Sequence, residues 1–249
     1  MKTVVVIPAR YASTRLPGKP LRLLAGKPLI QYVYERAVAA GFETVLVATD
    51  DERIQQVCEQ FRATVIMTAA SHPTGSDRLA EVAQRCGWND DTIVVNLQGD
   101  EPLTPVANLQ QLARNLRQHP QASIATLATP IADKNELLDP NIVKVVRNEQ
   151  GMALYFSRAS IPFQRDGDIV PVNNYALRHI GMYAYRVHFL KAFAHLSPSA
   201  LEQLEKLEQL RALSHGYQIH VDLAVALPGP GVDTADDAAK VESLLKAIV

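Results

Sequence analysis

Short apolar runs alternate with amphipathic segments along the first half of the chain, and no other feature limits the possible folds as strongly. Three such runs lie at residues 3–7, 44–49 and 92–97. They are typical of parallel strands, because helices cover both faces of a parallel sheet. Between them, residues 28–40 and 76–86 carry apolar side chains at helical spacing. The βαβα order predicts an α/β fold, a doubly wound and mostly parallel sheet flanked by helices, with ligands at the carboxyl ends of the strands.

The pattern changes after about residue 130, where strand-like runs follow one another with no long helix between them. We expect strands at 142–147, 153–157 and 176–185, an exposed loop at 163–174, and helices at 199–214 and 233–248. The sequence therefore predicts a smaller, mixed α+β region in the second half of one globular unit.

The nearly balanced charge of the chain limits the kinds of partner it can bind. It has 25 basic and 26 acidic residues, so a bulk electrostatic partner such as duplex nucleic acid is not expected. Cys58 and Cys86 lie in helix-like segments without metal-ligand spacing, which favours reduced thiols and a reducing compartment. The first residues do not resemble a signal peptide, and no apolar run approaches the ~18 residues of a membrane span. We expect a cytoplasmic protein without membrane insertion.

A basic loop follows the first strand directly. It gathers three cations and two hydroxyls within ten residues: Arg10, Arg15, Lys19, Ser13 and Thr14. The loop is neither a Walker A nor a G-x-G-x-x-G motif, since its one glycine is Gly18. Backbone N–H groups of a strand-to-helix loop suit phosphate oxygens, Arg adds bidentate bonds, and Lys adds a mobile point charge. The loop predicts a grip on a triphosphate, and a solvated basic turn is the alternative.

Two acidic positions far apart in the sequence are candidate metal ligands. Asp100 and Glu101 follow the strand that ends near residue 97, and Asp233 precedes the last helix. Mg²⁺ takes one or two protein carboxylates together with phosphate oxygens. The alternatives are a polar turn at Asp100 and a helix cap at Asp233.

Further polar residues are candidates for substrate contacts. In the turn 72–78, Gly75 permits close backbone approach, Ser76 and Asp77 suit a helix N-terminus, and capping does not explain Arg78. Arg158 stands at a strand end, where it could pair with a substrate carboxylate. His179 and Tyr183 share one side of a strand, although a satisfied core histidine is an alternative. The pair 208–209 (Glu-Gln) interrupts a leucine-rich helix, where a solvated face is the alternative.

Seven segments in this order resemble the 3-deoxy-manno-octulosonate cytidylyltransferases, and they span nearly the whole chain. They are R-Y-A-S-T-R-L-P-G-K-P-L at 10–21, H-P-T-G-S-D-R at 72–78, N-L-Q-G-D-E-P at 96–102, Y-F-S-R-A-S-I-P at 155–162, R-H-I-G-M-Y-A-Y-R at 178–186, L-E-K-L-E-Q-L-R at 204–211 and P-G-P-G-V-D-T at 228–234. The first segment also resembles sialic acid cytidylyltransferases and other sugar nucleotidyltransferases. The later segments narrow the match to the 3-deoxy-manno-octulosonate cytidylyltransferases.

The resemblance implies a Rossmann-like nucleotidyltransferase fold and a reaction. The enzyme would transfer CMP from CTP to 3-deoxy-D-manno-octulosonate (Kdo), giving CMP-Kdo and diphosphate with Mg²⁺ as cofactor, for lipopolysaccharide biosynthesis. A single domain would comprise a CTP-binding part (1–130), a sugar-binding and dimerisation part (131–220) and a closing strand and helix (221–249). The family is dimeric, and the region 163–190 would supply much of the interface of a homodimer.

The resemblance also implies a role for individual residues. The nucleotide would be held by Arg10, Ser13, Thr14, Arg15, Lys19, Thr74, Gly75, Ser76 and Arg78. The metal would be held by Asp100 and Asp233, and the catalytic residues would be Lys19, Arg15 and Asp100. The sugar acid would be surrounded by Gln98, Arg158, His179, Tyr183, Glu208 and Gln209, with Arg158 facing its carboxylate. The chain departs from the common family pattern at Ala235, where proline is usual, and at Thr74 and Ser76, where the two hydroxyl types are exchanged.

Three other functions remain open at this point. A cytidylyltransferase for the 8-amino variant of Kdo or for sialic acid would share most of these motifs. A glycosyltransferase would be expected to carry an Asp-x-Asp pair after the central strand, which Asp100 and Glu101 do not provide. A non-catalytic nucleotide-binding regulator would be expected to lose its metal carboxylates first, whereas Asp100 and Asp233 are both present.

Overall fold

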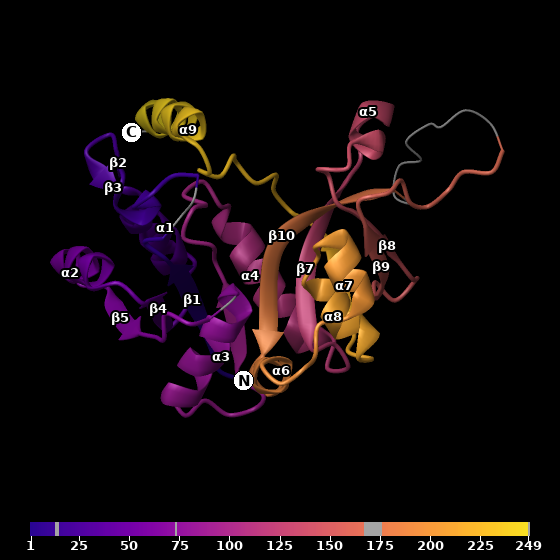
Figure 1. Ribbon diagram of the computed structural model, residues 1–249, viewed down its shortest axis with the longest axis horizontal. Helices are drawn as coiled ribbons and strands as arrows, with labels where there is room; N and C mark the ends of the chain where they lie inside the picture. The colour runs from indigo at the N-terminus through magenta and orange to yellow at the C-terminus, as the bar shows by residue number, and fades with distance from the viewer. Residues whose placement is uncertain (13–14, 73, 167–175, 249) are drawn as a thin grey trace.

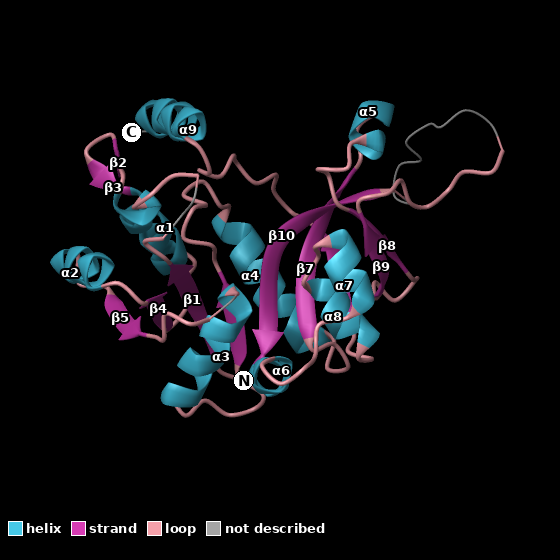
Figure 2. Cartoon of the chain, viewed as in Figure 1, coloured by secondary structure: helices cyan, strands magenta, loops and turns pink. Residues whose placement is uncertain are grey.

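The computed structural model describes residues 1–12, 15–72, 74–166 and 176–248 of the 249-residue chain. Within these residues, nine strands form one sheet, and seven of them lie in the order β11-β7-β10-β6-β1-β4-β5. Helices surround this sheet (Figure 2). No helix of the described part is both long and apolar enough to cross a membrane.

The predicted parallel strands form one half of the sheet. They are β1 (Thr3–Ala9), β4 (Thr44–Thr49), β5 (Thr64–Met67) and β6 (Ile93–Asn96). All neighbouring pairs among them are parallel. Side chains of β1 alternate between two buried clusters, with Val4 and Val6 in one and Val5 and Ile7 in the other. Burial on both faces explains the continuous apolar runs, and the prediction of a doubly wound parallel half is confirmed.

The second half of the sheet is mixed, as predicted. Its strands are β7 (Ile124–Pro130), β8 (Lys144–Arg147), β9 (Ala153–Ser157), β10 (Leu177–Arg186) and β11 (Ile219–Leu223). Strand β10 runs antiparallel to both β6 and β7 and so joins the two halves. A register shift lies between Ile180 and Tyr183 of this strand. The expected loop 163–174 is irregular from 163 to 166, and its remainder lies outside the described residues.

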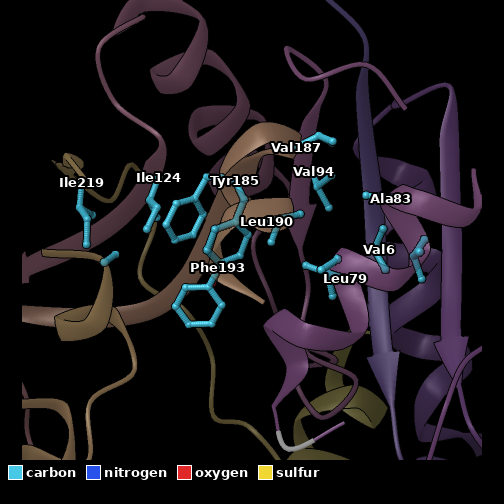
Figure 3. Close-up of a cluster of buried hydrophobic side chains, with 14 of the residues drawn as sticks. Val6, Leu79, Ala83, Val94, Ile124, Tyr185, Val187, Leu190, Phe193 and Ile219 are labelled. Atoms are coloured by element: carbon cyan, nitrogen blue, oxygen red, sulfur yellow. The ribbon is translucent and has the colours of Figure 1, made fainter. Parts of the chain in front are cut away.

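Helices pack on both faces of the sheet and complete the two cores. They are α1 (Leu29–Ala39), α2 (Glu52–Gln60), α3 (Gly75–Arg85), α4 (Val106–Gln118), α5 (Lys134–Leu138), α6 (Val187–Phe193), α7 (Ala200–Glu205), α8 (Gln209–Ser214) and α9 (Ala235–Ile248). Figure 3 shows one core, where Leu79 and Ala83 of α3 lie with Val6, Val94 and Tyr185 from three strands. Cys58 and Cys86 are free thiols, and burial raises the pKa of Cys58 to about 12.

The prediction of one helix over 199–214 is wrong. Two short helices, α7 and α8, are separated at Lys206, whose φ of 54° is left-handed. The break buries Leu207 and Leu210 in the core, whereas Leu204 remains 80% exposed. Leucine spacing fits either arrangement, so the periodicity alone did not reveal the break.

The C-terminal helix returns to the beginning of the chain. In Figure 1, α9 lies beside the short hairpin of β2 (Leu23–Leu24) and β3 (Lys27–Pro28). A third apolar cluster fastens this helix and combines side chains from both ends of the chain: Leu16, Leu24, Leu29, Val232, Ala238, Val241 and Leu245. Because Leu16 follows Arg15 and Val232 precedes Asp233, this packing brings the basic loop and the last acidic position together.

Candidate functional site

A cleft of about 350 Å³ opens at the carboxyl ends of β1 and β6, which are neighbours in the sheet. This is the edge at which ligands bind in parallel α/β sheets. The lining residues come from the basic loop, the start of α3 and the segment after β6: Pro8, Ala9, Arg10, Ala12, Arg15, Lys19, Pro20, Gly75, Gln98, Gly99 and Asp100. The fold therefore brings three predicted motifs, far apart in the sequence, to one cleft.

Lys19 lies between two carboxylates in this cleft. A 3₁₀ turn, Lys19–Leu21, begins after Gly18, whose left-handed φ of 66° lets its N–H donate to the Tyr11 carbonyl. Lys19 Nζ lies 2.6 Å from Asp100 Oδ2 and 3.1 Å from Asp233 Oδ1. Burial works against the charged amine, but the bonds and charges of Asp100 and Asp233 outweigh it and raise the pKa of Lys19. The predicted convergence of Asp100 and Asp233 is present, with a lysine between them.

Arg15 belongs to the same network but is more exposed. Its Nη2 lies 2.9 Å from Asp233 Oδ1, and 65% of its side chain is accessible against 14% for Lys19. Arg10 also lines the cleft, and burial together with the charge of Arg78 lowers its pKa. Burial is the larger cause, and the second cation, Arg78, adds positive charge that favours an anion near Arg10. Ser13 and Thr14 lie outside the described residues.

Asp233 does not cap the last helix. The hydroxyl of Thr234 accepts a hydrogen bond from the Asp237 N–H, and the Asp237 carboxylate accepts bonds from the backbone N–H groups of Asp233 and Thr234. Thr234 and Asp237 therefore supply the cap, and the capping interpretation of Asp233 is wrong. Its carboxylate is left to Arg15 and Lys19.

The acidic side of the cleft fits a divalent cation that arrives with phosphates. Beside Asp100, burial and the charges of Asp100 and Asp233 raise the pKa of Glu101 to about 7. Burial is the larger cause, and the two neighbouring carboxylates add to it. No cluster of three His, Cys, Asp or Glu residues among the described positions could hold a metal by itself. Two carboxylates are nonetheless the usual protein share of a Mg²⁺ site that phosphate oxygens complete.

The turn before α3 has both predicted features. Thr74 and Asp77 form a reciprocal capping box at the start of the helix. Arg78 is fully buried, and its guanidinium donates to Asp50 and Thr68, which follow β4 and β5. Arg78 therefore belongs to an internal ion pair with Asp50. This pair accounts for the arginine, which helix capping did not explain. Arg78 is not among the residues that line the cleft, but its charge contributes to the lowered pKa of Arg10.

Several predicted sugar-binding residues line a second, smaller cavity of about 50 Å³. Its polar lining consists of Ser76, Tyr183, Tyr185, Glu208 and Gln209. Ser76 Oγ donates to Glu208 Oε1 at 2.5 Å. Burial raises the pKa of Glu208, although hydrogen bonds from Ser76 and Thr74 oppose the shift. Tyr185, which lies two positions from Tyr183 and therefore on the same side of β10, is a site residue that the sequence analysis missed.

His179 has a hydrogen-bond partner within the protein. Its Nε2 lies 2.9 Å from Thr126 Oγ1, and its ring contacts Phe156 and Tyr183 at centroid distances of 4.9 and 5.4 Å. Burial lowers the pKa of His179 to about 3, so the ring is neutral at physiological pH. This supports the alternative in which His179 is a core histidine with its hydrogen bond satisfied. The ring nevertheless lies beside Tyr183, which lines the second cavity.

Arg158 is held by a carboxylate that the sequence analysis did not select. Its backbone N–H donates to Glu205 Oε2 at 2.9 Å, its Nε to the Glu205 carbonyl at 2.8 Å, and its Nη1 to the Pro140 carbonyl at 3.0 Å. Ser157 Oγ binds the other oxygen of the Glu205 carboxylate at 2.6 Å. Among the described residues, none of these bonds uses Nη2, so Arg158 retains a donor for an external anion.

Comparisons with known proteins agree on one family. Residues 4–219 match the cytidylyltransferase family. The 3-deoxy-manno-octulosonate cytidylyltransferase of Thioalkalivibrio sulfidiphilus is 58% identical over 99% of this chain and 100% of its own. The protein of the same name from Alteromonas mediterranea is 53% identical over the whole of both chains.

Solved structures extend this agreement to three dimensions. A structure of CMP:2-keto-3-deoxy-manno-octonic acid synthetase complexed with CTP superposes with a TM-score of 0.92, at 44% identity and full coverage of both chains. A cytidylyltransferase from Leptospira borgpetersenii shares the fold at 15% identity, with a TM-score of 0.64 over all of this chain and 88% of its own.

Proposed function

The chain belongs to the 3-deoxy-manno-octulosonate cytidylyltransferase family, and we propose that it transfers CMP from CTP to Kdo with release of diphosphate. One observation carries the proposal: Lys19 joins Asp100 and Asp233 within a cleft that Arg10 and Arg15 also line. The cleft thus combines cations for a triphosphate with carboxylates for a hard metal ion.

In this reaction the anomeric hydroxyl of Kdo attacks the α-phosphorus of CTP, and diphosphate leaves in line. Such a displacement is largely a matter of positioning and charge stabilisation. Lys19, Arg15 and Arg10 neutralise the charge that develops on the diphosphate. Mg²⁺, held by Asp100 and Asp233, would polarise the phosphate oxygens and lower the pKa of the attacking hydroxyl. Gly75 and Gln98 also line the cleft, where Gly75 allows the helix N-terminus to approach the nucleotide closely.

The sugar acid occupies the side of the site formed by the second half of the chain. Arg158 binds its carboxylate through Nη2, the donor that Glu205 and Pro140 leave available. The remaining polar groups suit the hydroxyls of an eight-carbon sugar: Gln98, His179, Tyr183, Glu208 and Gln209. The Nε2 of His179 donates to Thr126, whose hydroxyl donates to a backbone carbonyl, so the neutral ring can offer Nδ1 as an acceptor.

The pathway, the compartment and the oligomeric state are part of the same proposal. We place the enzyme in lipopolysaccharide biosynthesis in the cytoplasm, as a homodimer divided into the parts 1–130, 131–220 and 221–249. Two free thiols support a reducing compartment. Among the described residues of the middle part, where dimerisation is expected, five large apolar side chains stand exposed: Leu138 (50%), Leu154 (62%), Phe163 (83%), Leu201 (43%) and Leu204 (80%). Apolar groups exposed in this way favour an interface.

Mixing the protein with CTP, Mg²⁺ and Kdo is expected to release one diphosphate for each CMP-Kdo formed. Diphosphate is measured with a coupled pyrophosphatase assay, and CMP-Kdo by mass spectrometry. The control omits Kdo and should release none. Sialic acid and 8-amino-Kdo, offered in competition, should be poorer acceptors. Binding of CTP without diphosphate release would instead identify a nucleotide-binding regulator.

Glu205→Gln is expected to raise KM for Kdo about 10-fold while KM for CTP changes by less than about 2-fold. The amide cannot accept from both Ser157 Oγ and the Arg158 N–H, and one hydrogen bond to a charged group contributes about 1.5 kcal/mol. The backbone carbonyl of residue 205 still binds Arg158 Nε, so the side chain is loosened rather than released. Steady-state kinetics with each substrate varied in turn give the two constants.

A matched control lies in the same helix. Glu202 pairs with Arg211 at 2.6 Å, with both side chains largely buried, so Glu202→Gln also breaks a bond of an α7 carboxylate, here to α8. This variant should lower thermal stability without a selective change in KM for Kdo. Equal increases of both KM values in Glu205→Gln would show that Glu205 only stabilises the fold.

A further inference from the structure

The first turn of α3 separates the two cavities of the site. Gly75 lines the nucleotide cleft with Lys19 and Asp100, whereas the next residue, Ser76, lines the second cavity with Glu208. Consecutive residues of one helical turn therefore contribute to both cavities. A displacement of this turn by a ligand in one cavity would therefore also move a residue that lines the other cavity.

Ser76 connects this turn to the second half of the chain by a buried hydrogen bond. Its hydroxyl donates to Glu208 Oε1 at 2.5 Å, across 132 positions of sequence, and the residue is only 4% exposed. Tyr185 of β10 lines the same cavity as Ser76 and Glu208, and β10 pairs with β6. Ser76 thus lies at the centre of a polar contact that includes both halves of the sheet.

The turn is stiff enough to transmit such a displacement. Its capping box fixes Thr74 to Asp77 through reciprocal bonds of 3.1 and 3.3 Å, which enclose Gly75 and Ser76. Glu208 in turn precedes α8, whose Gln209 and Leu210 are buried. Packed elements of this kind shift between discrete positions and do not deform continuously.

We propose that Ser76 is a positioning residue that couples the nucleotide cleft to the sugar-acid site, acting through its hydrogen bond to Glu208. CTP that seats the first turn of α3 at Gly75 also directs the Ser76 hydroxyl, and the Glu208 carboxylate is then held for the hydroxyls of the sugar acid. The inference rests on the proposed function, because it assigns the cleft to CTP and Glu208 to the sugar acid. Since coupling between two ligands is reciprocal, Kdo must tighten CTP by the same factor.

Isothermal titration calorimetry tests the coupling without turnover. The nucleotide probe is a CTP analogue with a methylene group in place of the oxygen between the α- and β-phosphorus atoms, so no transfer occurs. Its dissociation constant is measured in the absence and presence of saturating Kdo, with Mg²⁺ in both. Wild-type protein is expected to bind the analogue about 5-fold or more tightly in the presence of Kdo, within the usual range of coupling free energies.

Ser76→Ala is expected to reduce this factor to about 1, whatever change it makes to each binary dissociation constant, because the factor compares the analogue's dissociation constants without and with Kdo in the same variant. Ser76→Thr retains the hydroxyl and should retain the coupling, and Ser76→Cys serves if the alanine variant does not fold. Ser243→Ala removes a hydroxyl that donates to the Ala239 carbonyl, outside both cavities, and should leave the factor unchanged. Rescue by threonine separates a positioning role from a structural one.

Two results would overturn the inference alone. One is a coupling factor of 1 in the wild-type protein when both ligands bind, and the other is an unchanged factor in Ser76→Ala. Failure of the wild-type protein to bind the CTP analogue or Kdo would overturn the proposed function, and this inference with it.

Discussion

Asp100→Asn is expected to lower kcat about 10³-fold while leaving the fold intact. The carboxylate is 32% exposed, and Lys19 is its hydrogen-bond partner among the described side chains, so its removal leaves no buried group unsatisfied. The backbone carbonyl of Asp100 accepts from the Val232 N–H, and that bond, which fastens the segment before α9, survives the substitution. The loss is therefore one of charge: an amide is a poor ligand for Mg²⁺, and Asp233 would hold the ion alone. Removal of a single preorganised electrostatic group already reduces kcat by 10²–10³-fold.

The expected result is checked by initial rates at saturating CTP and Kdo over a series of Mg²⁺ concentrations, with thermal unfolding measured in parallel. Asp90→Asn is the matched control, because Asp90 also pairs with a lysine, Lys191 at 2.7 Å, but lies outside the cleft. That variant should be fully active. Near-wild-type turnover of Asp100→Asn at every Mg²⁺ concentration would show that Asp100 is not a metal ligand.

The parallel half of the fold could be predicted because its signal is local. A strand buried on both faces is apolar along a continuous run, and residues 4–7 of β1 are such a run in both the sequence and the structure. The α7–α8 break could not be predicted in this way. Its cause is the left-handed backbone of Lys206, a conformation for which glycine and asparagine are the usual signals and lysine is not.

The two acidic positions show what local sequence can and cannot decide about a site. We considered only Asp233 as a cap of the last helix, although threonine, as at Thr234, is also a preferred N-cap residue. The structure assigns the cap to Thr234 and Asp237, which leaves Asp233 to the cleft. The decision depends on the third apolar cluster, which carries Val232 to Leu16 from the opposite end of the chain. Such packing has no signature within either segment alone.

For the same reason, contacts between side chains far apart in the sequence could not be predicted from the sequence. Ser76 and Glu208 were each selected, but as members of different substrate sites. Their hydrogen bond depends on how α3 and α8 pack across the sheet. Similarly, Glu205 lies in a helix with no buried residue, so no burial pattern distinguished it from its exposed neighbours.

Lys19→Ala is expected to lower kcat by about 10²–10³-fold, as for the loss of one preorganised donor. The Lys19 ammonium is only 14% exposed and lies between two carboxylates, so it is positioned before substrate binds. Lys19→Arg should recover part of the activity at most, because a planar guanidinium does not replace a compact ammonium in the same space. Arg15→Ala is the matched comparison. Arg15 binds the same Asp233 oxygen but is 65% exposed, so its removal should act mainly on KM for CTP.

A second measurement on Lys19→Ala separates catalysis from structure. Without the ammonium, the charges of Asp100, Asp233 and Glu101 are no longer balanced, so the pKa of Glu101 should rise further and the free energy of unfolding should fall. The same imbalance should make the nucleotide-free variant bind Mg²⁺ more tightly than the wild-type protein does, because a divalent cation would take the place of the lysine. Tighter Mg²⁺ binding together with lost turnover would show that Lys19 stabilises the transferring phosphates, a task that the metal alone does not perform. A variant that loses thermal stability but keeps its kcat would instead support the alternative interpretation of the basic loop as a solvated turn.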